Sequence, residues 1–337
     1  MAPEFSIILL TVFAGAGQGL FLFIFAADLL GAIRGAPLAP DTVTLAAVMA
    51  LALMTAGLVA SVFHLSHPLR GVKAARRYKS SWLSREALAL PPAMGLIALY
   101  GAAAWLDYSV DARLAIGAVA AAASLYLYLA TGMIYASVPY IKEWNTAYTP
   151  LSFTLIGLAV GGMGAVAALE ISGGGALTMV RGVIPILLAA ALVKWWHWRR
   201  NARLFTPFTP HAAIGVMRPD ARLMDMGTTY QHYNTTEYDA RAPAATVETM
   251  RYIVIGALFI GPLALLSLDY MPLLRGEGGW LGAPALVLAL TGAVAERWLF
   301  FVEGNHAQNL YYGTYRGRKG PNPLLESGKA HAPLPPR

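Results

Sequence analysis

Eight long apolar stretches run through this chain, and each is long enough for a helix to cross a lipid bilayer. A membrane-spanning helix needs about 20 mostly apolar residues. Hydrophobic residues make up 57% of the 337 residues and charged residues only 13%, a balance that excludes a soluble protein. The predicted spans are 5–33, 42–66, 83–106, 112–138, 148–170, 177–197, 250–269 and 280–303.

The stretches are apolar on all sides or follow the helical period, unlike the short alternating strands of a membrane β-barrel. The sequence therefore predicts an all-α, polytopic bundle of eight transmembrane helices over residues 1–315. A long loop, 198–249, interrupts the bundle, and a flexible tail follows over 316–337. The first stretch has no basic leader and no clean cleavage site, so we expect it to be retained as a span.

Basic residues orient this bundle. Eight spans put both termini on one side, here called side A, together with the segments 67–82, 139–148 and 198–249; the opposite side is side B. All but four of the 25 Lys and Arg lie in side-A loops or in the side-A half of a helix. By the positive-inside rule, side A and both termini are predicted to be cytoplasmic. The basic run 70–79 either sets this topology and attracts lipid headgroups or docks an acidic partner, and nucleic acid is not expected.

Charges at membrane depth are costly, by about 2.5–3.5 kcal/mol each at the bilayer centre, so they are seldom without a role. On side B, Asp28, Glu170 and Asp269 end their helices, and headgroup exposure explains them. The side-A half holds a larger set: His64, Arg85, Glu86, His197, Glu296 and Arg297.

Glu296 and Arg297 are neighbours in sequence, so on a helix their side chains point about 100° apart and neutralise one another poorly. Each is expected to find a partner on another helix, and an ion pair between Glu86 and Arg297 is plausible. Two interpretations stay open: an ion pair that packs helices, or a polar pocket for a ligand that exchanges protons.

His64 is either a lone interfacial histidine or a group that exchanges protons or donates to a carbonyl, since imidazole titrates near neutral pH. A bis-histidine haem b would need His64 and His197, both at helix ends, which makes haem unlikely. No metal site is expected on this chain, which has no cysteine for an iron–sulfur cluster.

Gln18 is expected to make a helix-packing hydrogen bond. Five tryptophans form an aromatic belt by default, and one or two could line a quinone pocket: Trp82, Trp144, Trp195, Trp196 and Trp198.

The segment 63–90, FHLSHPLRGVKAARRYKSSWLSREALAL, resembles the signature of the membrane anchor subunits of DMSO reductase-type molybdoenzymes. The matching residues are His64, Leu65, Pro68, Arg70, Leu83, Ser84 and Glu86. The opening EFSIILLTVFAGAGQG, the run from Trp144 to Pro150 and the Glu296–Arg297 pair also fit the family. His67 and the long 198–249 loop depart from its pattern.

This resemblance implies an oxidoreductase complex of three subunits in a bacterial inner membrane. One subunit is catalytic and holds molybdopterin, a second holds iron–sulfur clusters, and the anchor exchanges electrons with membrane ubiquinone or menaquinone. His64 and Glu86 would handle the quinone's protons, with Arg70, Arg85, Trp144, Glu296 and Arg297 forming or supporting the pocket.

A cytoplasmic site, a long cytoplasmic loop and the ending GNHAQNLYYG (304–313) most resemble the anchors of cytoplasmic sulfite-oxidising enzymes. Sulfite would then become sulfate on the partner, in sulfur metabolism, while quinone is reduced on this chain. The alternatives are an anchor that oxidises quinol to reduce DMSO or another sulfur oxide, and a haem b quinone cytochrome.

Overall fold

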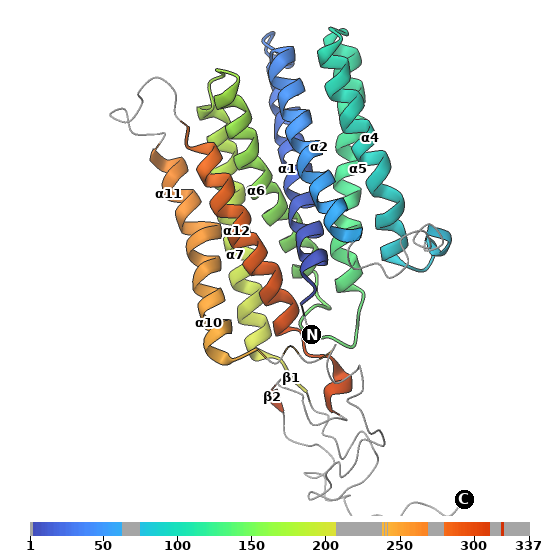
Figure 1. Cartoon of the computed structure of the whole chain (residues 1–337), viewed down its shortest axis with the longest axis vertical. Helices are drawn as coiled ribbons and strands as arrows, with labels where there is room; N and C mark the ends of the chain where they lie inside the picture. The colour runs from blue at the N-terminus through green and yellow to red at the C-terminus, as the bar shows by residue number, and fades with distance from the viewer. Residues whose placement is uncertain are drawn as a thin grey trace, which may run out of the picture.

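The computed structural model describes residues 3–62, 75–206, 238, 240, 242–268, 280–310 and 318–319. These residues form an all-helical bundle with eight helices long and apolar enough to cross a membrane, as the sequence predicts (Figure 1). Seven spans are single helices: α1 (Phe5–Ile33), α2 (Pro40–Val62), α4 (Trp82–Trp105), α5 (Val110–Ala136), α6 (Tyr148–Ile171), α7 (Leu177–Arg203) and α12 (Gly282–Glu303). The remaining span joins α10 (Ala244–Ile253), a π-helical segment η3 (Val254–Ile260) and α11 (Gly261–Leu268).

Short elements lie at the end of the bundle where α1 begins and α12 ends, which is side A. They are η2 (Ala75–Arg77), η5 (Ala307–Leu310) and a parallel pair of two-residue strands, β1 (Phe205–Thr206) and β2 (Arg318–Lys319). The predicted loop 198–249 is shorter than expected, because α7 continues to Arg203 and α10 already begins at Ala244. Basic residues in the last turn of α7 stabilise its carboxyl end, so the helix extends beyond the apolar segment that predicted it.

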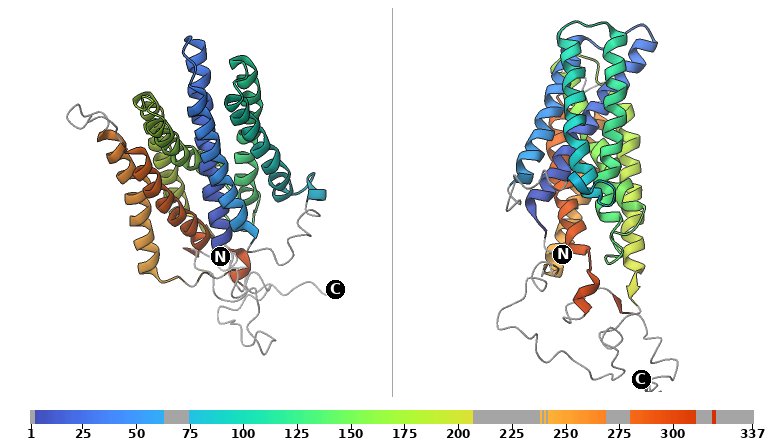
Figure 2. Two further views of the ribbon diagram at one scale, coloured as in Figure 1. Left: turned by 45° about the horizontal axis from the view of Figure 1, so that its top comes forward. Right: turned by 90° about the vertical axis from the view of Figure 1, so that its right-hand side faces the viewer.

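The helices α1 and α6 form the centre of the bundle, with α4 and α5 at one edge and α10–η3–α11 at the other (Figure 2). Small residues allow the central pair to approach closely. A Cβ added to Gly161 of α6 would lie 2.3 Å from the Ala16 carbonyl oxygen of α1, so only glycine fits there. Such contact between backbones fixes α1 and α6 as the frame on which the side chains of the site are arranged.

On side B, the sequence-based interpretation of Asp28 is wrong: its side chain is fully buried rather than exposed to headgroups. Arg113 donates to its two carboxylate oxygens at 2.6 and 3.0 Å, and the Tyr100 hydroxyl donates to it at 2.8 Å. The backbone N–H of Leu38 completes this shell at 3.1 Å. A buried pair with every oxygen bonded ties α1 to α4 and α5.

Glu170, the second acidic residue on side B, accepts hydrogen bonds from the backbone N–H groups of Leu281 and Gly282. It therefore caps the positive N-terminal end of α12 with a negative charge from α6. Asp269 lies outside the described residues.

Candidate functional site

Five of the seven predicted site residues lie in the described part of the chain: Arg85, Glu86, Trp144, Glu296 and Arg297. His64 and Arg70 lie outside the described residues. The five do not form one cluster. The structure divides them between a small cavity beside Glu86, a buried charged cluster and two supporting positions.

Glu86 is the fifth residue of α4, and its partly buried carboxyl points toward α5 and α1. The Thr131 hydroxyl of α5 donates to its Oε1 at 2.5 Å. Beside this pair lies a cavity of about 20 Å³, here called the Glu86 cavity, which Gln18, Tyr128 and Phe153 help to line. That volume matches a single water molecule.

The Glu86 cavity contains an unused acceptor. Gln18 Nε2 donates to the Ala14 carbonyl one turn earlier on its own helix α1 at 3.1 Å, so this hydrogen bond lies within one helix and does not join two helices as expected. Its buried Oε1 has no partner among the described residues. The Tyr128 hydroxyl donates to a second α1 carbonyl at 2.6 Å. A carboxyl, a hydroxyl and a free amide oxygen therefore surround a space in which a proton donor would be stabilised.

Arg85 points away from this cavity. Its Nε and Nη2 donate to the carbonyls of Tyr78 and Lys79 at 2.8 and 3.0 Å, and its guanidinium lies 4.2 Å from the Trp82 ring centre. Arg85 therefore fixes the segment before α4, and through it the start of the helix that carries Glu86.

The charged cluster consists of Lys194 of α7 with Glu296 and Arg297 of α12, all 3% exposed or less. Lys194 Nζ donates to Glu296 Oε1, and Arg297 Nη1 lies 2.8 Å from Glu296 Oε2. The predicted pair between Glu86 and Arg297 is therefore wrong: Arg297 contacts its own neighbour, and Glu86 accepts from Thr131.

The contact between the neighbours is close, but it lacks the alignment of a hydrogen bond, as expected for adjacent residues on a helix. Glu296 does find a partner on another helix, and that partner is Lys194. Two cations and one carboxylate leave the cluster with a net positive charge.

Aromatic rings lie between the two sites. The Arg297 guanidinium lies 3.4 Å from the ring centre of Phe153, which also lines the Glu86 cavity. The ring of Tyr135 packs 5.3 Å from the Phe153 ring. The Glu86 cavity and the charged cluster are thus neighbours across one aromatic layer.

Trp144 is 4% exposed, so it does not belong to an aromatic belt at the surface. Its Nε1 donates to the Phe300 carbonyl at 2.8 Å, and the two rings stack 5.0 Å apart. This side chain supports the site by fixing the loop before α6 against the end of α12.

His197 lies one turn beyond Lys194 and is buried. Its Nε2 lies 3.0 Å from the Glu143 carbonyl oxygen, and its ring stacks on Tyr148 at 6.1 Å. The histidine therefore joins α7 to the loop between α5 and α6. Among the described residues, no group of three or more His, Asp or Glu could hold a metal ion.

Thr131, Lys194 and Phe153 belong to the candidate site by their contacts, and the sequence did not reveal them. Lys194 was counted with the cytoplasmic charges, although it lies three residues before His197 and therefore on the same helix face. That spacing is the one signal that could have placed it inside the bundle. Nothing in the sequence distinguished Thr131 or Phe153 from ordinary residues of a span.

The comparisons with known proteins agree with this architecture. Residues 1–313 match the family model described as DMSO reductase anchor subunit (DmsC). The chain is also 36% identical over 325 residues to a sulfite dehydrogenase subunit of Allochromatium vinosum, covering 93% of this chain and 99% of that protein. The chain therefore belongs to the DMSO reductase anchor subunit family, whose members anchor molybdoenzyme complexes in the membrane.

Proposed function

We propose that this chain is the quinone-reactive anchor in a molybdopterin oxidoreductase of three subunits, where it takes electrons from an iron–sulfur subunit and reduces membrane quinone. Sulfite oxidation to sulfate on the catalytic subunit is the proposed source of electrons, because the similar protein of Allochromatium vinosum is a sulfite dehydrogenase subunit. The partner subunits and the electron-entry face lie on side A, which we place in the cytoplasm of a bacterial cell, at its inner membrane.

The observation that carries this proposal is the Glu86 cavity. A bound quinone supplies two-electron chemistry that takes up two protons. Glu86 is suited to deliver them, because its carboxyl stands at the side-A end of α4 and accepts from Thr131. The free Gln18 oxygen beside it can hold a proton-carrying water in line with that carboxyl.

At about 20 Å³ the Glu86 cavity is too small for a quinone ring, so these residues fit the proton path and not the ring itself. We assign hydrogen bonding to the ring to His64, and a contact to the partner or to the ring to Arg70; both residues lie outside the described part of the chain. The net positive charged cluster behind Phe153 would stabilise negative charge that arrives with the electrons.

Protons and electrons would both come from side A in this arrangement. Turnover is therefore expected to build little membrane potential. The reverse reaction, quinol oxidation for reduction of a sulfur oxide, would use the same residues in the opposite order.

The test is Glu86→Gln in the assembled complex of all three subunits. Sulfite-dependent quinone reduction is expected to fall about 100-fold, since a general acid or base contributes about 10²–10⁴-fold. Molybdenum and iron content should not change. Glu4→Gln, an exposed glutamate at the start of α1, is the matched control and should retain full activity. Full activity of Glu86→Gln would overturn the assignment.

A second variant tests the role of His64. His64→Ala should abolish quinone-linked activity while reduction of the iron–sulfur clusters by sulfite continues in the same preparation. An assembled His64→Ala complex with intact quinone reduction would show that another group protonates the quinone. If the complex instead oxidises quinol to reduce DMSO or another sulfur oxide, the proposed direction and substrate are wrong while the quinone site stands.

A further inference from the structure

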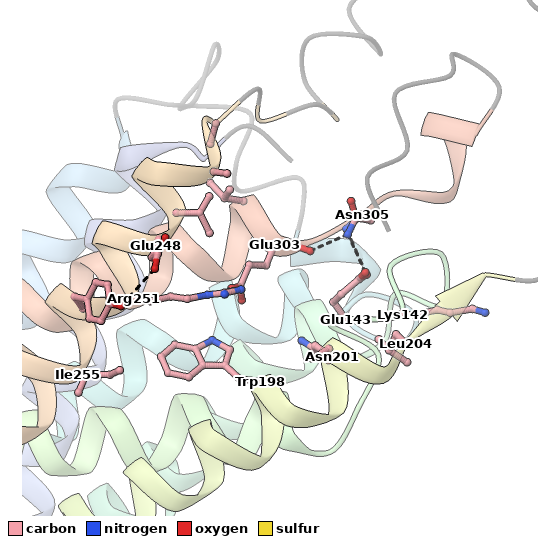
Figure 3. A pocket seen from close by; sticks show the side chains of 16 residues that line it. Lys142, Glu143, Trp198, Asn201, Leu204, Glu248, Arg251, Ile255, Glu303 and Asn305 are labelled. Carbon is pink, nitrogen blue, oxygen red and sulfur yellow. Dashed lines mark hydrogen bonds and ion pairs between the residues drawn. The ribbon is translucent and has the colours of Figure 1, made fainter. Parts of the chain in front are cut away.

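A second cavity lies at the side-A end of the bundle, away from Glu86. Its volume is about 950 Å³, and it is bounded by the end of α7, by α10 and the start of η3, and by the end of α12 (Figure 3). This is the upper end of the size range of small-molecule sites. We call it the side-A cavity, and the quinone site proposed above does not use it.

The side-A cavity reaches the lipid-facing surface. Tyr252 of α10 and Ile255 of η3 line it, yet they are 66% and 41% exposed. The span that carries them is only 22% buried over its apolar window, the lowest share among the eight. In a membrane these exposed side chains meet lipid, so an amphiphile can enter this cavity sideways from the leaflet on side A.

Polar groups surround the apolar floor of the cavity. Arg251 donates through Nε and Nη2 to Glu303 at 3.1 and 2.7 Å, and its Nη1 has no hydrogen bond to the described residues. Glu248 accepts from Tyr252 at 3.3 Å. In the view of Figure 3, the Arg251 side chain extends toward Glu303, with Glu248 above it and the indole of Trp198 below it.

Trp198 supplies an independent sign of a ligand. Its indole lines the cavity, and its Nε1–H is buried without a hydrogen-bond partner in the described structure. An unpaired buried donor is unfavourable, and an acceptor oxygen brought by a ligand would remove that penalty. The neighbouring guanidinium favours an oxygen that carries negative charge.

The lining thus combines the cation of Arg251 and the unpaired N–H of Trp198 with nearby carboxylates. We propose that the side-A cavity binds one phosphatidylethanolamine molecule. Its phosphate or ester oxygens accept from Trp198 and Arg251, its ammonium group donates to Glu248 and Glu303, and its acyl chains leave past Ile255 into the bilayer. A purely anionic headgroup is disfavoured, because three carboxylates (Glu143, Glu248 and Glu303) face two cations (Lys142 and Arg251) around the lining.

The first experiment measures retained lipid. The full chain with its partner subunits is extracted in mild detergent, delipidated, and offered phosphatidylethanolamine, phosphatidylcholine or phosphatidylglycerol, with bound lipid counted by native mass spectrometry. We expect one phosphatidylethanolamine per chain, held about tenfold more tightly than phosphatidylcholine, whose quaternary ammonium cannot donate hydrogen bonds. Equal retention of all three lipids would overturn the proposal, as would a quinone or no amphiphile in the site.

The second experiment uses matched tryptophan variants. Trp198→Phe keeps the ring and removes the buried N–H, so retention should fall about tenfold. Trp195→Phe makes the same change three residues earlier, on an exposed ring outside the cavity, and should retain lipid like the natural chain. Arg251→Gln should also reduce retention, and it provides the test if Trp198→Phe does not assemble. Equal retention by Trp198→Phe and Trp195→Phe would contradict the assigned contact.

Discussion

At the scale of single residues, the stability of the charged cluster depends on one buried carboxylate that faces two buried cations, so substitution of any of the three residues should destabilise the bundle. Glu296 is the one carboxylate that serves both Lys194 and Arg297, and none of the three is more than 3% exposed. Removing one partner of a buried pair strands a charge, which costs more than the pair itself contributes. The three positions should therefore differ in how much their loss destabilises the bundle.

Lys194→Met is expected to lower the free energy of unfolding by about 3 kcal/mol, because Glu296 keeps only its poorly aligned contact with Arg297. Glu296→Gln should cost more, since it leaves two buried cations without an anion. Unfolding in mixed micelles measures both. Glu303→Gln, which breaks the more exposed pair with Arg251, is the control and should cost about 1 kcal/mol or less. Similar decreases in the free energy of unfolding for Lys194→Met, Glu296→Gln and Glu303→Gln would show that burial does not make the charged cluster more sensitive to substitution.

His306, beyond the end of α12, gives a pH dependence outside the membrane. Its ring stacks 4.4 Å from Tyr238, and burial lowers its pKa by penalising the charged imidazolium. Below about pH 6.5 His306 then binds more protons in the unfolded chain than in the folded one, so its contribution to stability is present above that pH and is lost as pH drops below it.

The measurement compares the Tm of the natural chain with that of His306→Gln at pH 8 and pH 5.5. The natural chain should lose more Tm on acidification than the variant, which has no imidazole to charge at this position. Identical pH responses would mean that His306 does not titrate between the two pH values.

The sequence singled out Glu86 as a candidate, but it could not predict the residues that surround its carboxyl. A carboxylate at the start of a span is a clear anomaly, and the family signature includes it. Thr131 is an ordinary hydroxyl within α5, and only the packing of α4 against α5 brings it to Glu86. The same limit explains the wrong pair with Arg297: depth along a helix follows from sequence, whereas rotation about its axis follows from packing.

At the scale of elements, all eight spans could be predicted because an apolar window of about 20 residues is nearly sufficient for a membrane helix. The ends were harder. The last turns of α7, WRRNAR, are polar and continue the helix beyond the membrane core, where hydropathy gives no signal. The π-helical η3 also escaped prediction, because no apolar pattern distinguishes it from an α-helix.

Contact between α1 and α6 makes a sharp prediction at this scale. Gly161→Ala would put a methyl group 2.3 Å from the Ala16 carbonyl oxygen, so it should destabilise the bundle by about 1–3 kcal/mol through overpacking. Gly95→Ala in α4 meets no atom within 4 Å and should be neutral or more stable by about 0.5–1 kcal/mol. Thermal unfolding in detergent separates them, and equal Tm values would show that the helices can move apart without cost.

At the scale of the whole molecule, orientation decides what the site can do. The structure puts Glu86, the charged cluster and the side-A cavity in the same half of the bundle, while the fully bonded Asp28–Arg113 pair occupies the other half. In the proposed function, a ligand near Glu86 would therefore exchange protons and electrons with side A. Whether those come from the cytoplasm depends on the positive-inside assignment, which follows from the basic residues alone.

The lack of cysteine makes this assignment directly testable, since any single introduced thiol is unique. Ser80→Cys, exposed on side A before α4, should react with a membrane-impermeant maleimide in inside-out vesicles and not in intact cells. Tyr108→Cys, 60% exposed on side B, should show the opposite pattern. The cysteine-free chain controls for background. Labelling of Ser80→Cys from outside the cell would show that the bundle has the opposite orientation. The partner subunits would then lie outside the cytoplasm, and the proposed sulfite oxidation would occur on the outer face.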